Sequence, residues 1–143
     1  MSHDPALYPV PRGGIDPIRC ANDALAVLAL GAPYGHESIA ILLDHRRRGS
    51  SVLVVNDTTE ADAMFAVIDA CLTARASVDV IDGLILATSR PGGDVVADDV
   101  HRWLEASDQC AAGGLRLVEW FVLGRRGPRC PRELFGEPPR WRR

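Results

Sequence analysis

The chain has 143 residues, of which 47% are hydrophobic and 24% are charged, the composition of one soluble globular domain. No apolar run approaches the roughly 20 residues needed to span a bilayer, and the N-terminus lacks a basic region followed by an apolar core. We therefore expect a cytoplasmic protein with no membrane association and no secretory signal.

The net charge of −3 hides an uneven distribution of charge along the chain. Residues 1–123 carry 9 arginines against 17 acids, whereas residues 124–143 carry 7 arginines against 2 acids, and the chain has no lysine. The sequence thus predicts an acidic body followed by a basic tail.

The four cysteines lie far apart in the sequence, and no two form a C-x-x-C pair. Cys71 and Cys110 fall within amphipathic helical patterns, where cysteine behaves as a small buried hydrophobic residue. A disulfide framework or a zinc site needs closer or paired spacing, so we expect neither.

The N-terminal region contains an arm and a helix. Residues 1–15 hold three prolines and two adjacent glycines, which predicts an extended arm. A helix is predicted over 17–30, because Asp16 precedes a proline at the first helical position and apolar residues recur at helical spacing. Gly31 is suited to the C-terminal cap of this helix.

A hairpin and a second helix follow. The runs 39–43 and 52–55 are rich in β-branched and aliphatic residues and predict two strands joined by a charged loop at 44–49. Asp57 is predicted to cap the next helix, with Glu60 at the capping-box position.

The continuous apolar run 83–88 predicts a central strand that is covered on both faces. A third helix is expected to begin at Asp98 or Asp99 and to end at the two glycines 113–114, before a last strand at 115–123.

The resulting element order, α-β-β-α-β-α-β, predicts a single α/β domain over 16–124, with a central mixed sheet flanked by helices. Residues 125–143, rich in arginine and proline, are predicted to form a C-terminal tail.

The segment 88–94 reads Thr-Ser-Arg-Pro-Gly-Gly-Asp and joins the predicted central strand to the third helix. Such a turn directs backbone N–H groups toward one point, which suits either an active site or a tight strand-to-helix connection. Spacing alone favours the connection.

Three segments resemble the JAB/MPN metalloprotease superfamily, particularly its RadC-like bacterial branch. The segment 88–94 corresponds to the family pattern H-x-H-P-S-G-D, and 114–124 to a glycine followed by an apolar strand and a final V-G. The segment 36–43 resembles P-x-E-x-x-x-L-L. The resemblance covers residues 17–124 and implies a three-layer arrangement like that of cytidine deaminases.

The resemblance also implies where a catalytic site would lie. In the family, two histidines and an aspartate hold zinc, and a glutamate activates the zinc-bound water. Carried over by position, Glu37 matches the glutamate, whereas Thr88 and Arg90 replace the histidines. Asp99 matches the aspartate if the loop is two residues shorter, and His101 takes that place if it is not. The family's supporting serine has no match, since Val96 or Asp98 falls there.

These replacements predict a vestigial site with no bound metal and no cofactor. A threonine hydroxyl is a weak zinc ligand, and an arginine keeps its proton and repels a cation. We expect the Arg90 guanidinium to replace the metal charge and to pair with Glu37, Asp99 or both.

A competing hypothesis has Arg90 and the amides of Gly92 and Gly93 bind an anion. The carboxylates of Asp94 and the two aspartates at 98–99 crowd the same helix end and oppose it.

Three functions follow from these features. The leading hypothesis is a non-catalytic interaction or scaffold domain that self-associates. The second is a divergent hydrolase that uses Glu37 with a relocated metal. The third is a RadC-like nucleic-acid accessory protein that uses the 125–143 tail, where arginines alternate with aromatic residues. The acidic body favours a tail that packs along that body or along a partner subunit.

Overall fold

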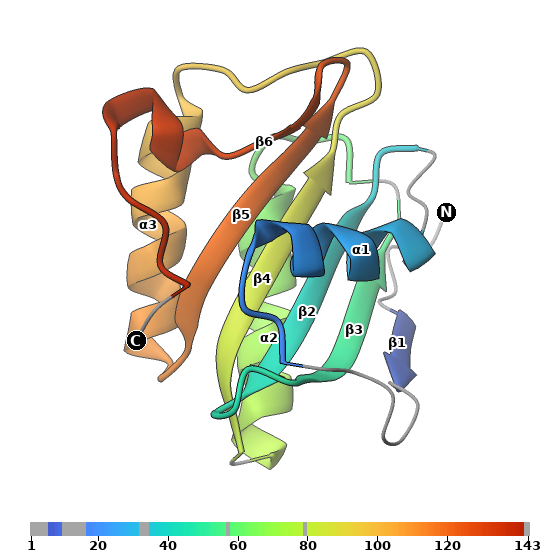
Figure 1. Ribbon diagram of the computed structural model, residues 1–143, viewed down its shortest axis with the longest axis vertical. Coiled ribbons are helices and arrows are strands. Elements are labelled where there is room, and N and C mark those ends of the chain that lie inside the picture. Colours follow the sequence, from blue (N-terminus) through green and yellow to red (C-terminus); the bar gives the residue numbers. More distant parts are fainter. Residues whose placement is uncertain (1–5, 10–16, 32–34, 57, 79, 142–143) are drawn as a thin grey trace.

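The computed structural model describes residues 6–9, 17–31, 35–56, 58–78 and 80–141. Over these residues the chain forms one α/β domain built on a six-stranded mixed sheet (Figure 1). The predicted α/β class with a central mixed sheet is therefore confirmed.

The elements of the described residues alternate along the chain in nearly the predicted order. The strands are β1 (Ala6–Pro9), β2 (Ser38–Asp44), β3 (Gly49–Val55), β4 (Ile81–Ser89), β5 (Arg116–Gly124) and β6 (Gly127–Arg129). The helices are α1 (Ala21–Gly31), α2 (Ala63–Ser77), α3 (Asp99–Ala112) and the short 3₁₀ helix η1 (Pro131–Phe135). The sheet order is β1-β3-β2-β4-β5-β6, in which β4 and β5 are parallel and all other neighbours are antiparallel.

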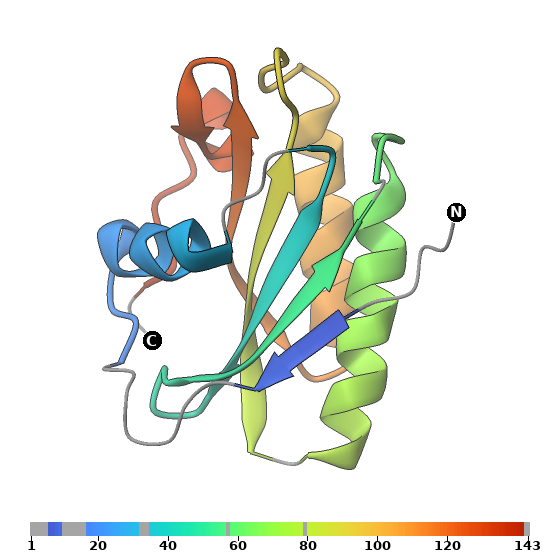
Figure 2. The same cartoon turned by 90° about the vertical axis from the view of Figure 1, so that its right-hand side faces the viewer.

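The domain has three layers, with α1 on one face of the sheet and α2 and α3 on the other (Figure 2). Successive residues of β4 serve both sides, because Leu84 and Leu86 pack toward α2 and α3 while Ile85 and Ala87 pack toward α1. Burial on both faces explains the continuous apolar run of β4.

A bulge in β5 decides which of its side chains reach each face. Leu84 pairs with Leu117 and Ile85 with Glu119, so Val118 is an extra residue in β5. After the bulge, Trp120 faces α2 and α3, and Glu119 lies on the side of α1. The bulge thus determines the faces that the side chains of Glu119 and Trp120 reach.

The helix α1 begins at Ala21, so the predicted start at 17 is wrong. The Ile18 N–H donates to the Arg47 carbonyl at 2.8 Å, and the Ile18 side chain is buried in the core. This contact holds the chain against the β2–β3 turn before the helix begins. Asp16 lies outside the described residues.

The helix α2 begins at Ala63, later than the predicted cap at 57 allows, and residue 57 itself lies outside the described residues. Thr58 stays beside the sheet, because its N–H donates to the His36 carbonyl at 2.8 Å and its hydroxyl accepts from Ser38 at 2.9 Å. Glu60 therefore precedes the helix.

Residues 6–9 of the predicted N-terminal arm form β1, which pairs with β3 at the edge of the sheet. The described part of the arm is thus a strand of the domain.

The C-terminal region also belongs to the domain. We call residues 127–141 the C-terminal strap, which runs from β6 through η1 and along α3 (Figure 1). Its Arg132 Nε donates to the Glu119 carboxylate at 2.9 Å, and Glu119 is fully buried. The described part of the segment beyond 124 therefore packs along the body, the arrangement that the acidic body favoured.

The far end of the strap is held on α3. The Arg140 guanidinium lies 4.3 Å from the Trp103 ring centroid and donates to the Leu117 carbonyl at 3.2 Å and to the Ser107 hydroxyl at 3.0 Å. Glu137 accepts from Trp103 Nε1 at 2.9 Å and from Arg140 at 2.7 Å. Two of the tail's arginines are thus engaged within the domain.

We expect Arg132→Ala to lower the free energy of unfolding by about 3 kcal/mol, because it leaves the Glu119 carboxylate buried without its cation. Arg129→Ala is the matched control, since Arg129 is an exposed arginine of the same strap, and should change stability by less than about 0.5 kcal/mol. Urea unfolding measures both. Equal effects of the two variants would contradict the role given to Arg132.

Candidate functional site

The candidate site lies where β4 ends and the chain passes through residues 90–98 into α3. At this point β4 has an antiparallel neighbour, β2, on one side and a parallel neighbour, β5, on the other. Such a change in strand direction places loops and a helix N-terminus together at the strand ends, where α/β proteins commonly bind ligands. The structure therefore puts the segment 88–94 in a position suited to a site.

Arg90 and Asp99 form a two-point ion pair at this position. Arg90 NH1 lies 2.6 Å from Asp99 Oδ2, and Arg90 NH2 lies 2.9 Å from Asp99 Oδ1. The Arg90 side chain is 17% exposed and that of Asp99 is 0% exposed. Parallel bonds from one guanidinium to one carboxylate fix both groups in orientation.

Further donors surround the Asp99 carboxylate. The Val96 N–H donates to Oδ2 at 2.8 Å, and Arg102 NH1 donates to Oδ1 at 2.9 Å. Arg102 also donates to Asp62, just before α2, at 3.0 Å. Each oxygen of Asp99 thus accepts two hydrogen bonds from the domain itself.

These donors determine the ionisation of Asp99. Burial alone would raise the pKa of its carboxyl. The hydrogen bonds from Arg90, the Val96 amide and Arg102 outweigh burial and lower the pKa below its ordinary value of 3.8. Asp99 is therefore a carboxylate held in its charged form.

Thr88 and Arg90 lie on the same face of the sheet, two residues apart. The Thr88 hydroxyl accepts a hydrogen bond from Trp120 Nε1 at 2.9 Å, and the Arg90 guanidinium lies 5.9 Å from the Trp120 ring centroid. Trp120 is fully buried. One tryptophan therefore contacts both Thr88 and Arg90, the residues that the resemblance sets at the histidine positions.

The turn after β4 is held by backbone contacts. The Gly93 N–H donates to the Arg90 carbonyl at 2.8 Å, and the Gly93 carbonyl accepts from the Arg125 N–H at 2.7 Å. A Cβ on Gly124 would lie 2.5 Å from the Gly93 carbonyl oxygen, so only glycine allows this close approach. The Gly93 amide is thus used inside the turn, which weakens the anion-site hypothesis.

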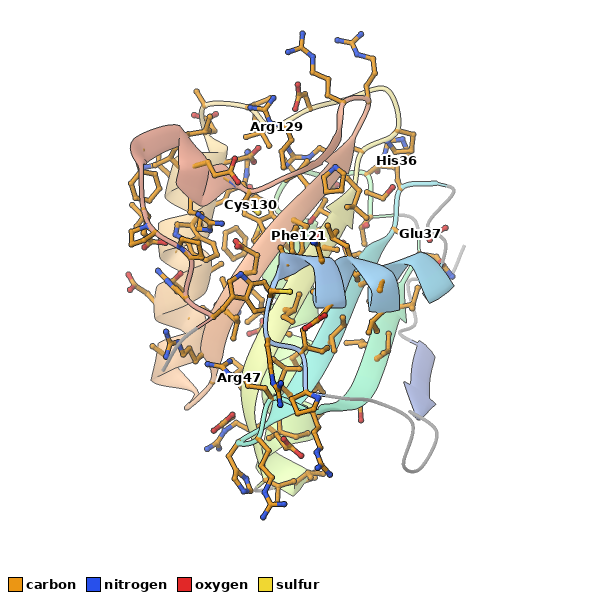
Figure 3. All side chains as sticks on the ribbon, viewed as in Figure 1. His36, Glu37, Arg47, Phe121, Arg129 and Cys130 are labelled. Carbon is orange, nitrogen blue, oxygen red and sulfur yellow. The ribbon has the colours of Figure 1, made fainter. Side chains whose placement is uncertain are left out.

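Glu37 does not join this cluster. Ser38 pairs with Thr88, and the Ser38 hydroxyl donates to Thr58 on the side of α2. Glu37 precedes β2, and its backbone carbonyl accepts from the Ser89 N–H at 2.8 Å. Figure 3 shows His36 and Glu37 where the chain enters β2. Among the described residues, Arg90 pairs with Asp99 and forms no ion pair with Glu37.

The structure separates the two alternatives for the family's aspartate. Asp99 is buried beside Arg90, whereas His101 is exposed on α3. The two positions considered for the family's serine, Val96 and Asp98, are also exposed. The Val96 amide contacts Asp99, but neither of these two side chains supplies a hydroxyl.

The cluster does not fit the zinc ion that the family resemblance implies. Thr88 already accepts from Trp120, and Arg90 places a permanent positive charge where a cation would bind. Both oxygens of Asp99 are occupied by donors from the domain. Within the described residues, no group of three or more His, Cys, Asp or Glu side chains is placed to hold a metal.

The resemblance placed Thr88 and Arg90 together with either Asp99 or His101, whereas Trp120 and Arg102 were missed. Arg102 stands three residues after Asp99, a spacing that brings side chains together on a helix, so its role was detectable. The contact of Trp120 with Thr88 depends on the bulge in β5 and on strand pairing, which the sequence does not display.

Comparison of the chain with protein-family models, with curated proteins and with solved structures found no match. No helix in the described residues is long and apolar enough to cross a membrane.

The ion pair predicts a pH dependence of stability. Since the pKa of Asp99 is lowered on folding, its contribution is present above the ordinary pKa of 3.8 and is lost as the pH falls below that value. Asp99→Asn should therefore lower the free energy of unfolding by about 3 kcal/mol at neutral pH. This deficit should shrink as urea unfolding is repeated from about pH 5 down to about pH 2.5.

Asp108→Asn is the matched control, because Asp108 is an exposed aspartate of the same helix. Its stability should follow that of the unmodified protein at each pH. A deficit of Asp99→Asn that stays constant across the acidic range would contradict the charged state assigned to Asp99.

Proposed function

We propose that this chain is a metal-free, non-catalytic domain of JAB/MPN-like architecture that acts as an interaction or scaffold protein. The observation that carries the proposal is the two-point contact of Arg90 with Asp99. A guanidinium bound there supplies positive charge beside the carboxylate without an open coordination position for water.

The arrangement of the layers supports the JAB/MPN-like assignment. The element order from α1 to β5 matches the order that the family resemblance implies, with α1 on one face of the sheet and two helices on the other. The turn after β4 also keeps a proline, a glycine and an aspartate at the family positions, and Gly124 allows that turn to pack on β5.

The hydrolase alternative receives less support from the geometry. Its proposed base, Glu37, precedes β2 and forms no ion pair with Arg90 among the described residues, where Arg90 pairs with Asp99. A relocated metal would need other ligands beside Glu37, and the described residues offer no such group. A general base must reach the water that it activates, so Glu37 and the cluster do not form one catalytic site.

The proposal predicts the outcome of metal analysis. After incubation with zinc and buffer exchange, the protein should retain far less than about one equivalent of zinc by mass spectrometry of the metal, because its cluster lacks neutral nitrogen ligands. The double variant Thr88→His/Arg90→His should retain about one equivalent, since it frees Asp99 and restores two imidazoles on the same face.

Adding Asp99→Asn to the double variant is the control, because it removes the third expected ligand and should abolish the gain. Stoichiometric zinc in the unmodified protein would overturn the metal-free proposal. Failure of a folded double variant to bind zinc would contradict the JAB/MPN-like origin of the cluster.

The nucleic-acid alternative keeps one favourable observation, the exposure of Arg125, Arg126 and Arg129 around the β5–β6 turn. Arg132 and Arg140 are engaged within the domain, so deletion of the whole tail would also damage the fold.

The sharper test of this alternative is the triple variant Arg125→Gln/Arg126→Gln/Arg129→Gln. Fluorescence anisotropy with a single-stranded oligonucleotide would show salt-dependent binding by the unmodified protein and its loss in the variant if the turn bound phosphates. Under the interaction-domain proposal we expect no binding at about 0.15 M salt, where the acidic body repels a polyanion.

A further inference from the structure

The strand β5 is paired on both of its sides over only part of its length. On one side, β4 pairs with β5 from Arg116 to Leu123. On the other side, β6 pairs with Val122, Leu123 and Gly124 alone. Among the described residues, the side of β5 away from β4 therefore has no strand beside it over 116–121. We call this stretch the β5 edge.

Side chains take the place of a strand at the β5 edge. Arg140 of the C-terminal strap donates to the Leu117 carbonyl at 3.2 Å. The Trp120 N–H donates to Glu119 Oε1 at 3.2 Å, and Arg132 of the strap donates to Oε2 of that carboxylate at 2.9 Å. Covering a strand edge with a loop and with charged side chains prevents it from pairing with another chain. The closed strap thus occupies groups that a neighbouring strand would use.

The contacts that hold the strap are mainly polar. Its two engaged arginines supply ion pairs and hydrogen bonds to α3 and β5, whereas Leu134 and Phe135 of η1 are 49% and 45% exposed. Cys130 and the partly buried Trp141 pack against the apolar cluster on the side of α1. Because a buried ion pair contributes little net stability, moving the strap away costs much less than unfolding the sheet.

We propose that the C-terminal strap opens and closes as a unit while the rest of the domain stays folded, and that its closing blocks a contact with a second copy at the β5 edge. Contacts among the strands β1–β5 and the helices α1–α3 do not involve the strap. These contacts therefore remain when Arg132 and Arg140 leave the body.

The backbone of the β5 edge is complementary to its own copy. The Leu117 carbonyl and the Trp120 N–H are bound by side chains and lie on either side of the bulge at Val118. In an antiparallel, two-fold pairing of two such edges, the carbonyl of each copy meets the N–H of the other. Opening of the strap would free both groups for this pairing.

The four cysteines provide a direct test of strap opening. Cys20 is exposed, Cys71 and Cys110 are fully buried between the sheet and the helices, and Cys130 is buried within the strap. While the strap is closed, burial raises the pKa of the Cys130 thiol, which suppresses the reactive thiolate. The full chain is treated with N-ethylmaleimide, and mass spectrometry of its peptides follows each cysteine over time.

Cys130 should react at least about tenfold faster than Cys71 and Cys110, because it becomes accessible without global unfolding. Low concentrations of urea should accelerate Cys130 only weakly and the two core cysteines strongly, since opening of the strap exposes less surface. Equal rates and equal urea dependences for the three buried cysteines would overturn the opening of the strap.

Two variants separate the strap from the core. Ile68→Val, in the fully buried part of α2, should accelerate Cys110 about threefold or more and leave Cys130 unchanged, because the open state keeps this packing. Arg140→Gln should accelerate Cys130, because it removes an anchor of the closed strap. Equal acceleration of Cys130 and Cys110 by Ile68→Val would contradict opening as a unit.

Sedimentation velocity tests what the closed strap blocks. At about 100 µM, Arg132→Gln/Arg140→Gln should sediment largely as a dimer, whereas the unmodified 15.5 kDa chain should remain largely monomeric. Arg125→Gln/Arg129→Gln is the matched control, because it removes two exposed arginines of the β5–β6 turn and β6 and should stay monomeric. Circular dichroism establishes folding, and Arg140→Gln alone replaces the double variant if that variant does not fold.

A folded strap variant that stays monomeric would overturn the blocked contact. Equal dimerisation of the control variant would overturn it as well, since loss of positive charge alone would then explain the association. Both readouts are independent of zinc content, so failure of this inference is distinct from failure of the metal-free proposal.

Discussion

The pairing of Arg90 with Asp99 is the interaction on which the C-terminal end of the sheet depends. Asp99 is fully buried at the first residue of α3, and a buried carboxylate without a cation would be strongly destabilising. Arg90 meets this need from the end of β4, and Arg102 extends the network to Asp62 before α2. One carboxylate therefore joins the central strand to both helices that cover its face, and the site is a structural junction.

Side chains on the two faces of the sheet make different contacts. On the side of α2 and α3, Trp120 contacts Thr88 and Arg90. On the other side, Glu119 turns toward Arg132 and attaches the strap. Adjacent residues of β5 thus anchor two distant parts of the chain, because the bulge at Val118 fixes which face each one reaches. The bulge therefore determines both the contact of Trp120 with the site and the attachment of the strap through Glu119.

Patterns internal to one element predicted much of this fold, and contacts between elements account for the errors. The apolar run of β4 and the glycines after α3 indicated those elements directly. The starts of α1 and α2 were misplaced because Ile18 and Thr58 bond to residues far along the chain. Pairing of Arg90 with Asp99 was one of the predicted alternatives, because a charged side chain needs a partner of opposite charge. The contact of Trp120 with Thr88 depends on the register of β4 and β5, which the sequence does not display. The charge split favoured packing of the C-terminal segment along the body, but its particular anchors in α3 and β5 could not be predicted.

The strap also has a consequence for how the domain is made. Its contacts to Trp103, Leu117 and Glu119 come from residues synthesised after every element that they cover. A nascent chain that ends before Arg132 would keep a buried acid without its cation and part of β5 without its cover. Such a chain is expected to remain open to proteases and chaperones, so the domain closes only after the strap has been synthesised.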